Sequence, residues 1–216
     1  DDSSPSSIRF AMPLEGDILL QDAIKGTIRF PSESLDDWII ARWSEPGEIG
    51  VPTYNFSVVV DDVAMRVSHV IRGDDHVANT PKQIPLFEAL GYALPVFAHV
   101  PMILGKDKQK LSKRHGAASI TEFKDLGFLP QAVRLTLAKL SWTPKIDGRV
   151  AASAEEEILT DAQLIESFNL EDIQTSPSVF DIDKLYWINQ KLIMNSTNEF
   201  LIQALNPFMP PPWLIR

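Results

Sequence analysis

Residues 106–116 read Lys-Asp-Lys-Gln-Lys-Leu-Ser-Lys-Arg-His-Gly, a short polar segment that we call the basic loop. It collects five cations, although the formal net charge of the chain is −9: Lys106, Lys108, Lys110, Lys113 and Arg114. Cations this close repel one another, so the cluster predicts a bound polyanion such as a phosphate chain. Leu111 is expected to point inward and anchor the loop, and Ser112 adds a hydroxyl donor. A solvated loop without a ligand is the alternative interpretation.

The composition limits the remaining possibilities. A length of 216 residues permits one large domain or two small ones with a real core. The chain has no cysteine, which excludes disulfides and thiolate metal sites within these residues. No stretch approaches the roughly 20 apolar residues of a membrane span, so we expect no membrane contact. The absence of cysteine fits an intracellular setting, which we expect to be the cytoplasm or an organelle (mitochondrion or plastid). Because the protein is acidic, any contact with nucleic acid must be local.

Upstream of the basic loop, the pattern predicts strands. Residues 8–50 alternate short strand-like runs with turn residues, which indicates a small β-rich module. Residues 54–60 end in a continuous β-branched run, which predicts a strand covered on both faces and closed by Asp61-Asp62. A second buried strand is predicted at residues 67–72, with Arg72 at its carboxyl end. Ligands of α/β sheets bind at that end, so Arg72 is a candidate for holding an anion.

The alternative role of Arg72 is an ion pair with Asp74 or Asp75. Downstream, capping residues and apolar periodicity predict helices that begin at Asn79-Thr80-Pro81 and that span about 129–140, 161–167 and 181–193.

Five stretches resemble glutamyl-tRNA synthetases of the bacterial and organellar type, which are class I aminoacyl-tRNA synthetases, in the family's order and spacing. They cover about residues 8–195: Ile28–Trp38, Pro52–Asp62, His69–Pro81, Lys110–Arg114 and Val179–Asn189. Lys110-Leu111-Ser112-Lys113-Arg114 is similar to the family's Lys-Met-Ser-Lys-Ser signature.

The resemblance implies an α/β fold, namely the second half of a class I Rossmann-like catalytic domain, with a small β-rich insertion before it and a helical stem-contact region after it. Residues 1–51 would be part of the inserted connective domain. Residues 52–125 would form the second half of the nucleotide-binding catalytic domain, and residues 126–216 the stem-contact domain.

The resemblance also implies ATP-dependent activation of L-glutamate and its transfer to tRNA(Glu). Arg72 would bind the γ-carboxylate of glutamate, and Asp75 would lie near the amino-acid and ATP pocket. The segment Tyr54-Asn55-Phe56-Ser57-Val58 would line the amino-acid pocket.

Met102 and Ile103 would flank the adenine of ATP, and Lys110, Leu111, Ser112, Lys113 and Arg114 would contact the nucleotide. Lys110 and Lys113 would be catalytic, because they would stabilise charge that develops on the phosphates. Mg²⁺ is expected to arrive with ATP, with no dedicated protein site and no zinc.

The histidines, His69, His76, His99 and His115, do not lie in the His-x-Gly-His element that class I synthetases carry in the first half of the nucleotide fold. We therefore expect a middle segment of a longer enzyme, inactive alone, whose exposed sheet edge is covered by the missing N-terminal half or by another partner.

Two other interpretations remain open. One is a non-catalytic, synthetase-like scaffold or tRNA-binding subunit; the other is a relative that acts on glutamine or on a tRNA base. A P-loop nucleotidase is rejected, because Gly105-Lys106 lacks both the upstream glycine and a following Ser or Thr.

Overall fold

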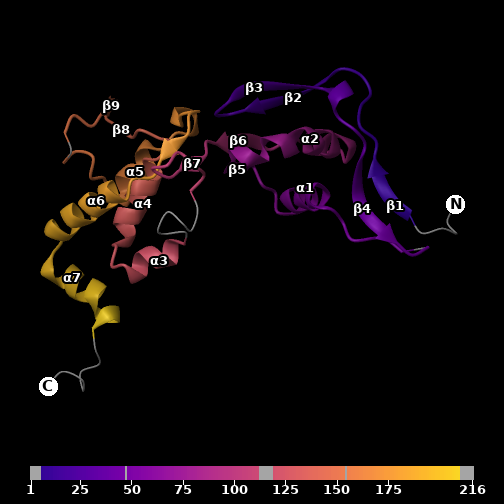
Figure 1. The fold of residues 1–216 in the computed structure, drawn as a ribbon. Helices are drawn as coiled ribbons and strands as arrows, with labels where there is room; N and C mark the ends of the chain where they lie inside the picture. The colour runs from indigo at the N-terminus through magenta and orange to yellow at the C-terminus, as the bar shows by residue number, and fades with distance from the viewer. Residues whose placement is uncertain (1–5, 47, 112–118, 154, 210–216) are drawn as a thin grey trace. The chain divides into compact units, whose positions relative to one another are not determined.

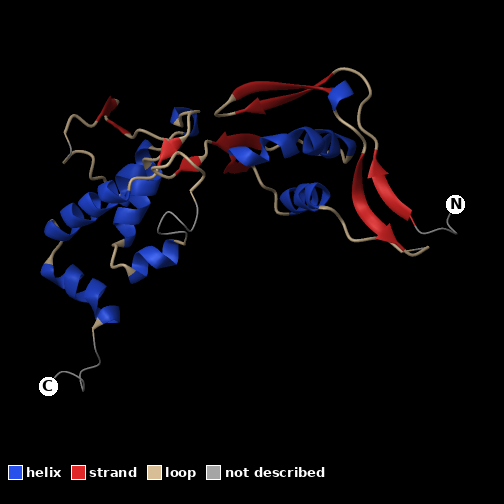
Figure 2. Cartoon of the chain, viewed as in Figure 1, coloured by secondary structure: helices blue, strands red, loops and turns tan. Residues whose placement is uncertain are grey.

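The structure is a computed structural model that describes residues 6–46, 48–111, 119–153 and 155–209. The chain forms two compact units, Asp1–Pro101 and Met102–Arg216, which are described one at a time. Figures 1 and 2 show that the first unit is made of strands and helices and that helices dominate the second. The predicted division into three domains, with boundaries at residues 51 and 125, stays a prediction, because the two compact units do not establish where those boundaries lie.

The described residues of the first unit form two sheets. Strands β1 (Ser6–Phe10) and β4 (Trp38–Ser44) pair antiparallel. A four-stranded sheet has the order β3-β2-β6-β5, and its members are β2 (Asp17–Asp22), β3 (Gly26–Pro31), β5 (His69–Gly73) and β6 (Val96–Val100). The hairpin β2–β3 joins the parallel pair β5–β6 through one bridge, between Asp22 and Phe97. The strand-like runs predicted in residues 8–50 are thus confirmed, and two of them extend a sheet that continues to residue 100.

The predicted strand at residues 54–60 is wrong, because this segment is the first part of helix α1 (Tyr54–Ala64). Thr53 keeps extended backbone angles (φ −86°, ψ 161°), and its carbonyl accepts the N–H groups of Phe56 and Ser57. The core-facing residues Phe56, Val59 and Val63 recur at the three- and four-residue spacing of a helix. The β-branched run hid this period, and packing on the core outweighs its strand propensity. Asp61 and Asp62 therefore lie inside the helix and close no strand.

The link from β4 to α1 is held tightly. Arg42 N–H donates to the carbonyl of Val51 at 2.9 Å, and Thr53 N–H donates to that of Ile40 at 2.8 Å. A Cβ on Gly50 would lie 1.8 Å from the carbonyl oxygen of Arg42, so only glycine fits this close approach. The first turn of α1 is consequently fixed against the β1–β4 pair.

The second predicted strand exists as β5, with Arg72 at its carboxyl end, but its predicted burial is wrong. β5 is an edge strand, and Ile71 is 52% exposed. Beyond β5 the chain forms the 3₁₀ turn η2 (Asp74–Asn79) and then helix α2 (Thr80–Ala89), which begins where the sequence predicts. Pro85 lies inside α2, where it is buried beside Ile84 and Leu86.

The second unit is mainly helical. Strands β7 (Ile103–Leu104) and β10 (Ser178–Val179) pair parallel, and β8 (Lys145–Ile146) and β9 (Arg149–Val150) form a short hairpin. The helices are α3 (Ile120–Asp125), α4 (Pro130–Ala138), α5 (Asp161–Ser167), α6 (Ile182–Met194) and α7 (Asn198–Leu205). The helices predicted near 129–140, 161–167 and 181–193 are confirmed as α4, α5 and α6, whereas α3 and α7 were not predicted.

The core of the second unit lies where α4 packs on α6. Leu135, Leu185 and Ile188 are at most 1% exposed there. The side chains of Phe123, Phe128 and Phe180 extend this core toward α3 and β10. Because β10 pairs with β7, the start of the basic loop is attached to this helical core.

Candidate active site

Arg72 is fixed by three side chains of the first unit. Its Nε donates to His99 Nε2 at 3.1 Å, and its Nη2 donates to Thr80 Oγ1 and Gln83 Oε1, each at 2.8 Å. Gln83 in turn donates to Asn55 Oδ1 at 3.0 Å, which links the arginine to the first turn of α1. Thr80, Gln83 and His99 are each at most 1% exposed, so the guanidinium rests on a rigid floor. We call Arg72, Thr80, Gln83, His99 and Asp22 the Arg72 network.

His99 and Asp22 continue the network into the sheet. His99 Nδ1 lies 2.6 Å from Asp22 Oδ2, and both side chains have no exposed surface. An arginine can only donate, so His99 Nε2 must accept from it and cannot carry a proton. The proton of the neutral ring is therefore on Nδ1, which donates to Asp22. Burial lowers the pKa of His99, and although Asp22 opposes that shift, the pKa stays below its ordinary value.

Asp22 ends strand β2 and closes the β2–β3 turn. Its Oδ1 accepts the backbone N–H groups of Ile24 and Lys25, at 3.0 and 2.9 Å. Burial by itself would raise the pKa of Asp22, but the hydrogen bonds from the His99 side chain and from the backbone N–H groups of Lys25, Ile24 and His99 hold it below its ordinary value. Asp22 is thus an ionised acceptor inside the protein.

The surroundings of Arg72 are desolvated and short of counter-charge. Burial lowers the pKa of Arg72, and Tyr54, Asp62 and Asp22 oppose that shift from a distance. Among the described residues no carboxylate lies within ion-pair distance of Arg72. Asp74, one of the two predicted alternative partners, instead pairs with Lys25 at 2.9 Å. A carboxylate that reached Arg72 would therefore meet a cation partly stripped of water, where such contacts are strong.

The Asp22–His99 pair predicts how stability depends on pH. Unfolded histidine takes up a proton near pH 6.5, whereas folded His99 resists it, so the unfolded state binds more protons just below that pH. The free energy of unfolding should therefore fall as the pH drops below about 6.5. Asp22 adds a second loss below about pH 3.8, because its folded pKa is depressed.

Urea titrations at several pH values between 7.5 and 5.0, followed by tryptophan fluorescence, measure the first loss. The control is His99→Gln, which cannot titrate and should show a shallower decline over the same range. Equal slopes in the two proteins would contradict this assignment.

The segment predicted to line the amino-acid pocket lies in the first turns of α1. Tyr54 is 56% exposed, and its ring lies 6.2 Å from that of His76. Asn55 reaches the Arg72 network through Gln83, and Phe56 and Val58 pack on the core. Ser57 is half-buried. Asp75 is exposed in η2, with Oδ1 placed 2.6 Å from the position of a Cβ on Gly73. The structure thus brings Tyr54, Asn55 and Arg72 together.

In the second unit, the basic loop starts as a tight hairpin. Gly105 N–H donates to the Gln109 carbonyl at 2.8 Å, and Leu111 N–H donates to the Ile103 carbonyl at 2.9 Å. Leu104 and Lys110 form an antiparallel bridge. Leu111 packs against the helical core, which confirms that it anchors the loop.

Lys106 has acidic partners at the start of α6. Its Nζ lies 2.5 Å from Asp183 Oδ2 and 3.3 Å from Asp181 Oδ1, and these contacts raise the pKa of Lys106. One of the crowded cations is therefore neutralised within the chain, and it fastens the loop to α6. Lys108 and Lys110 are exposed, and the predicted Ser112, Lys113 and Arg114 lie outside the described residues.

The predicted adenine-flanking residues border the same hairpin. Ile103 is in β7 and packs partly on the helical core, and the Met102 carbonyl accepts from Ser178 N–H at 3.3 Å. Both side chains are half-buried.

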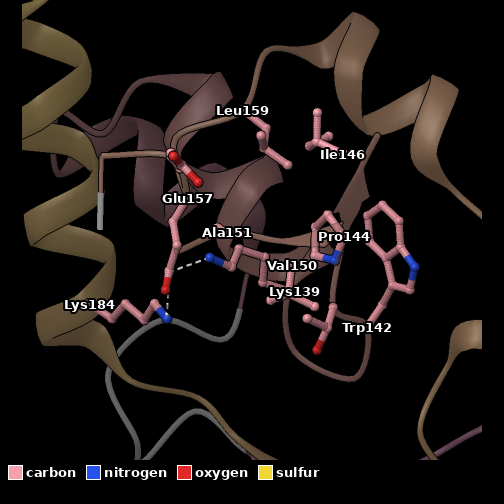
Figure 3. A pocket seen from close by; sticks show the side chains of 11 residues that line it. Lys139, Trp142, Pro144, Ile146, Val150, Ala151, Glu157, Leu159 and Lys184 are labelled. Atoms are coloured by element: carbon pink, nitrogen blue, oxygen red, sulfur yellow. Dashed lines mark hydrogen bonds and ion pairs between the residues drawn. The ribbon is translucent and has the colours of Figure 1, made fainter. Parts of the chain in front are cut away.

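A pocket of about 210 Å³ lies elsewhere in the second unit (Figure 3). Trp142, Ile146 and Leu159 form an apolar side, and Lys139 and Lys184 both pair with Glu157 (Figure 3). Because one carboxylate serves both lysines, this cluster is explained as a structural ion pair.

Within the described ranges, no three or more His, Cys, Asp or Glu side chains form a group able to hold a metal ion. Of the helices described, none has both the length and the apolar composition to cross a membrane.

Sequence reasoning found Arg72 but missed the residues that hold it. His99 follows an apolar run, Asp22 comes two residues after the strand-like run predicted at residues 18–20, and Thr80 and Gln83 lie one turn apart on the predicted helix. A polar side chain at a strand's end or on a helix's buried face was the available signal. The link across 77 residues between Asp22 and His99 has no local signature.

Comparison with known proteins identifies a family. Residues 1–187 match the family model for the catalytic domain of class I tRNA synthetases (E and Q). Among similar proteins, "Glutamate--tRNA ligase" of Trichlorobacter lovleyi is 48% identical over 205 residues, and that of Geobacter sulfurreducens is 48% identical over 209. The matches cover 95% and 97% of this chain but only 41% and 42% of those proteins. The chain thus spans about two-fifths of the length of these relatives.

A solved structure supports the same relationship. The glutamate tRNA ligase of Elizabethkingia meningosepticum, crystallised in complex with its amino acid, superposes with a TM-score of 0.79 at 30% identity. The match covers 94% of this chain and 41% of that one. The α/β fold class implied by the sequence is therefore confirmed, and the chain belongs to the class I tRNA synthetases (E and Q), whose catalytic domain it matches.

Proposed function

We propose that this chain contributes the amino-acid pocket and the basic loop to a longer glutamyl-tRNA synthetase, which activates L-glutamate with ATP and ligates it to tRNA(Glu). The observation that carries the proposal is the Arg72 guanidinium, a half-buried cation whose described hydrogen-bond partners are all neutral. A site built this way favours a carboxylate over an uncharged amide, because only the carboxylate offsets the desolvated charge. Arg72 would hold the γ-carboxylate of glutamate.

Tyr54 and the first turn of α1 would border the same pocket, with Phe56, Ser57 and Val58 shaping it from behind. Asp75 would lie near the amino-acid and ATP pocket. The Gln83–Asn55 hydrogen bond supports this placement, because it ties the helix that would line the pocket to the arginine that would hold the ligand. Positioning of this kind is a principal source of catalysis in reactions that join two bound substrates.

The basic loop would act on ATP. In activation, a carboxylate oxygen of glutamate forms a bond to the α-phosphorus as the bond to pyrophosphate breaks. Lys110 and Lys113 would stabilise the charge on the α-phosphate and on the departing pyrophosphate. Leu111, Ser112 and Arg114 would complete the loop's contacts, and Met102 and Ile103 would flank the adenine. Since the described residues offer no carboxylate cluster for a metal, Mg²⁺ would arrive on ATP, ligated mainly by phosphate and water.

The edge of β5 supports the proposal that further chain completes the domain. In the described residues β5 pairs with β6 alone, and Ile71 in it is 52% exposed. An unpaired, partly apolar edge of this kind calls for a covering strand. We propose that the N-terminal half of the same enzyme supplies that strand.

Aminoacylation by the full-length protein tests the proposal. Glutamate should be transferred to tRNA(Glu) in the presence of ATP, and glutamine should be a far poorer substrate. Lys110→Ala should lower kcat/KM by a factor that corresponds to a loss of about 2–4 kcal/mol of transition-state stabilisation. Glutamate binding should stay nearly unchanged.

Lys145→Ala is the matched control, because Lys145 is an exposed lysine of the β8–β9 hairpin and pairs with Asp172. Activity with glutamine equal to that with glutamate would refute the proposed specificity, and full activity of Lys110→Ala would refute the role of Lys110.

A further inference from the structure

The Arg72 network contains a directional chain of hydrogen bonds that reaches from the backbone of one turn to the guanidinium. Backbone N–H groups of Ile24 and Lys25 donate to Asp22 Oδ1. Asp22 Oδ2 accepts from His99 Nδ1 at 2.6 Å, and His99 Nε2 accepts from Arg72 Nε at 3.1 Å. Each link uses one donor and one acceptor, so the proton position on His99 decides whether Arg72 keeps its bond.

We propose that Asp22 and His99 are positioning residues for the substrate carboxylate: Asp22 selects the Nδ1-protonated tautomer of His99, and the bare Nε2 then orients the Arg72 fork. This inference rests on the proposed function, in which Arg72 receives the γ-carboxylate of glutamate. Neither residue touches the ligand, and both act through Arg72.

The need for such a device follows from the chemistry of arginine. The guanidinium has five N–H donors in one plane, and His99, Thr80 and Gln83 engage three of them, on Nε and Nη2. The N–H groups of Nη1 are left to meet a carboxylate, and they point at it only if the rotation of that plane is set. Thr80 and Gln83 bind one nitrogen, Nη2, and His99 binds Nε, so the histidine supplies the second fixed point that defines the plane. Phe97 adds a weaker constraint, with its ring centroid 5.7 Å from the guanidinium carbon.

Asp22→Asn reverses the chain without changing its shape. The amide oxygen must stay at the position of Oδ1, where it accepts from Ile24 and Lys25. The amide nitrogen then faces His99 Nδ1 and donates to it, which forces the histidine proton to Nε2. Nε2–H would then face Arg72 Nε–H and could donate only to Thr80 Oγ1, 3.3 Å away, so Arg72 Nε–H would lose its acceptor. The loss of this fixed point should weaken glutamate binding on the order of tenfold to a hundredfold.

His99→Gln provides the control background. Glutamine keeps an oxygen that can accept from Arg72, and its amide rotates freely, so it has no tautomer for the side chain at position 22 to select. The amide nitrogen that Asp22→Asn introduces also faces the backbone N–H of His99, but that cost is the same with either side chain at position 99. In a double-mutant cycle on the full-length protein, Asp22→Asn should therefore weaken glutamate binding strongly when His99 is present and little in the His99→Gln background.

Two measurements decide the matter. The first is calorimetric titration with glutamate of the wild type, both single variants and the double variant; non-additivity of tenfold or more is expected, and additive effects would overturn the inference. The second is ¹⁵N NMR of the histidine rings in the ligand-free wild type, which should show His99 protonated at Nδ1 alone near pH 7. A proton on Nε2 would overturn the inference even if a variant fails to fold. Absence of glutamate binding by the wild type would instead refute the proposed function.

Discussion

Replacing Arg72 by glutamine is expected to weaken glutamate binding by about 2–5 kcal/mol, which is roughly 30-fold to several-thousand-fold in Kd. The variant removes a half-buried guanidinium and leaves the substrate carboxylate with no cation to offset its desolvation. It also deprives Thr80, Gln83 and His99 of a shared donor. Arg72→Lys should lose less, because the charge remains, yet it should not restore wild-type affinity, since a lysine cannot reproduce the planar fork.

Calorimetric titration with glutamate and with glutamine measures the effect, and the ratio of the two affinities should fall toward one in Arg72→Gln. Arg29→Gln is a matched control, because Arg29 is a largely exposed arginine of the same unit that pairs with Asp17. Glutamate affinity equal to that of the wild type in Arg72→Gln would show that the carboxylate is bound elsewhere.

Leu185→Ala is expected to lower the free energy of unfolding by about 2–5 kcal/mol. Leu185 has no exposed surface and lies where α6 packs on α4, so its truncation leaves a cavity that rigid helices cannot close. The substitution should also weaken the attachment of the basic loop, because the two aspartates that hold Lys106 lie at the start of α6.

Urea unfolding followed by circular dichroism measures this loss. Met194→Ala, at a 70% exposed position at the end of the same helix, should change stability by about 0.5 kcal/mol or less. A loss for Leu185→Ala no larger than that of Met194→Ala would contradict the assignment of α4 and α6 as the core.

Local rules recovered much of the fold. Apolar periodicity located α4, and capping residues located α5 and α6, because these signals lie within each helix's own sequence. Turn residues located β2 and β3 for the same reason. The rule failed at residues 54–60, where three consecutive valines favour a strand locally but Phe56, Val59 and Val63 bury one helical face. Only the surface on which this segment packs shows whether its buried residues follow the helical or the strand period.

The sequence by itself determined the family, and it predicted anionic ligands and Arg72 as the residue to hold one of them. The family follows from five stretches that match in order and spacing over about residues 8–195, and the two predictions follow from residue types within short segments. None of them needs knowledge of distant contacts. Tertiary structure alone decided that Arg72 has neutral partners rather than Asp74, that Asp22 reaches His99, and that Lys106 is held by α6. Each of these depends on side chains that are far apart in sequence and meet only after strands or helices pack, and burial then sets the protonation states that the chemistry requires.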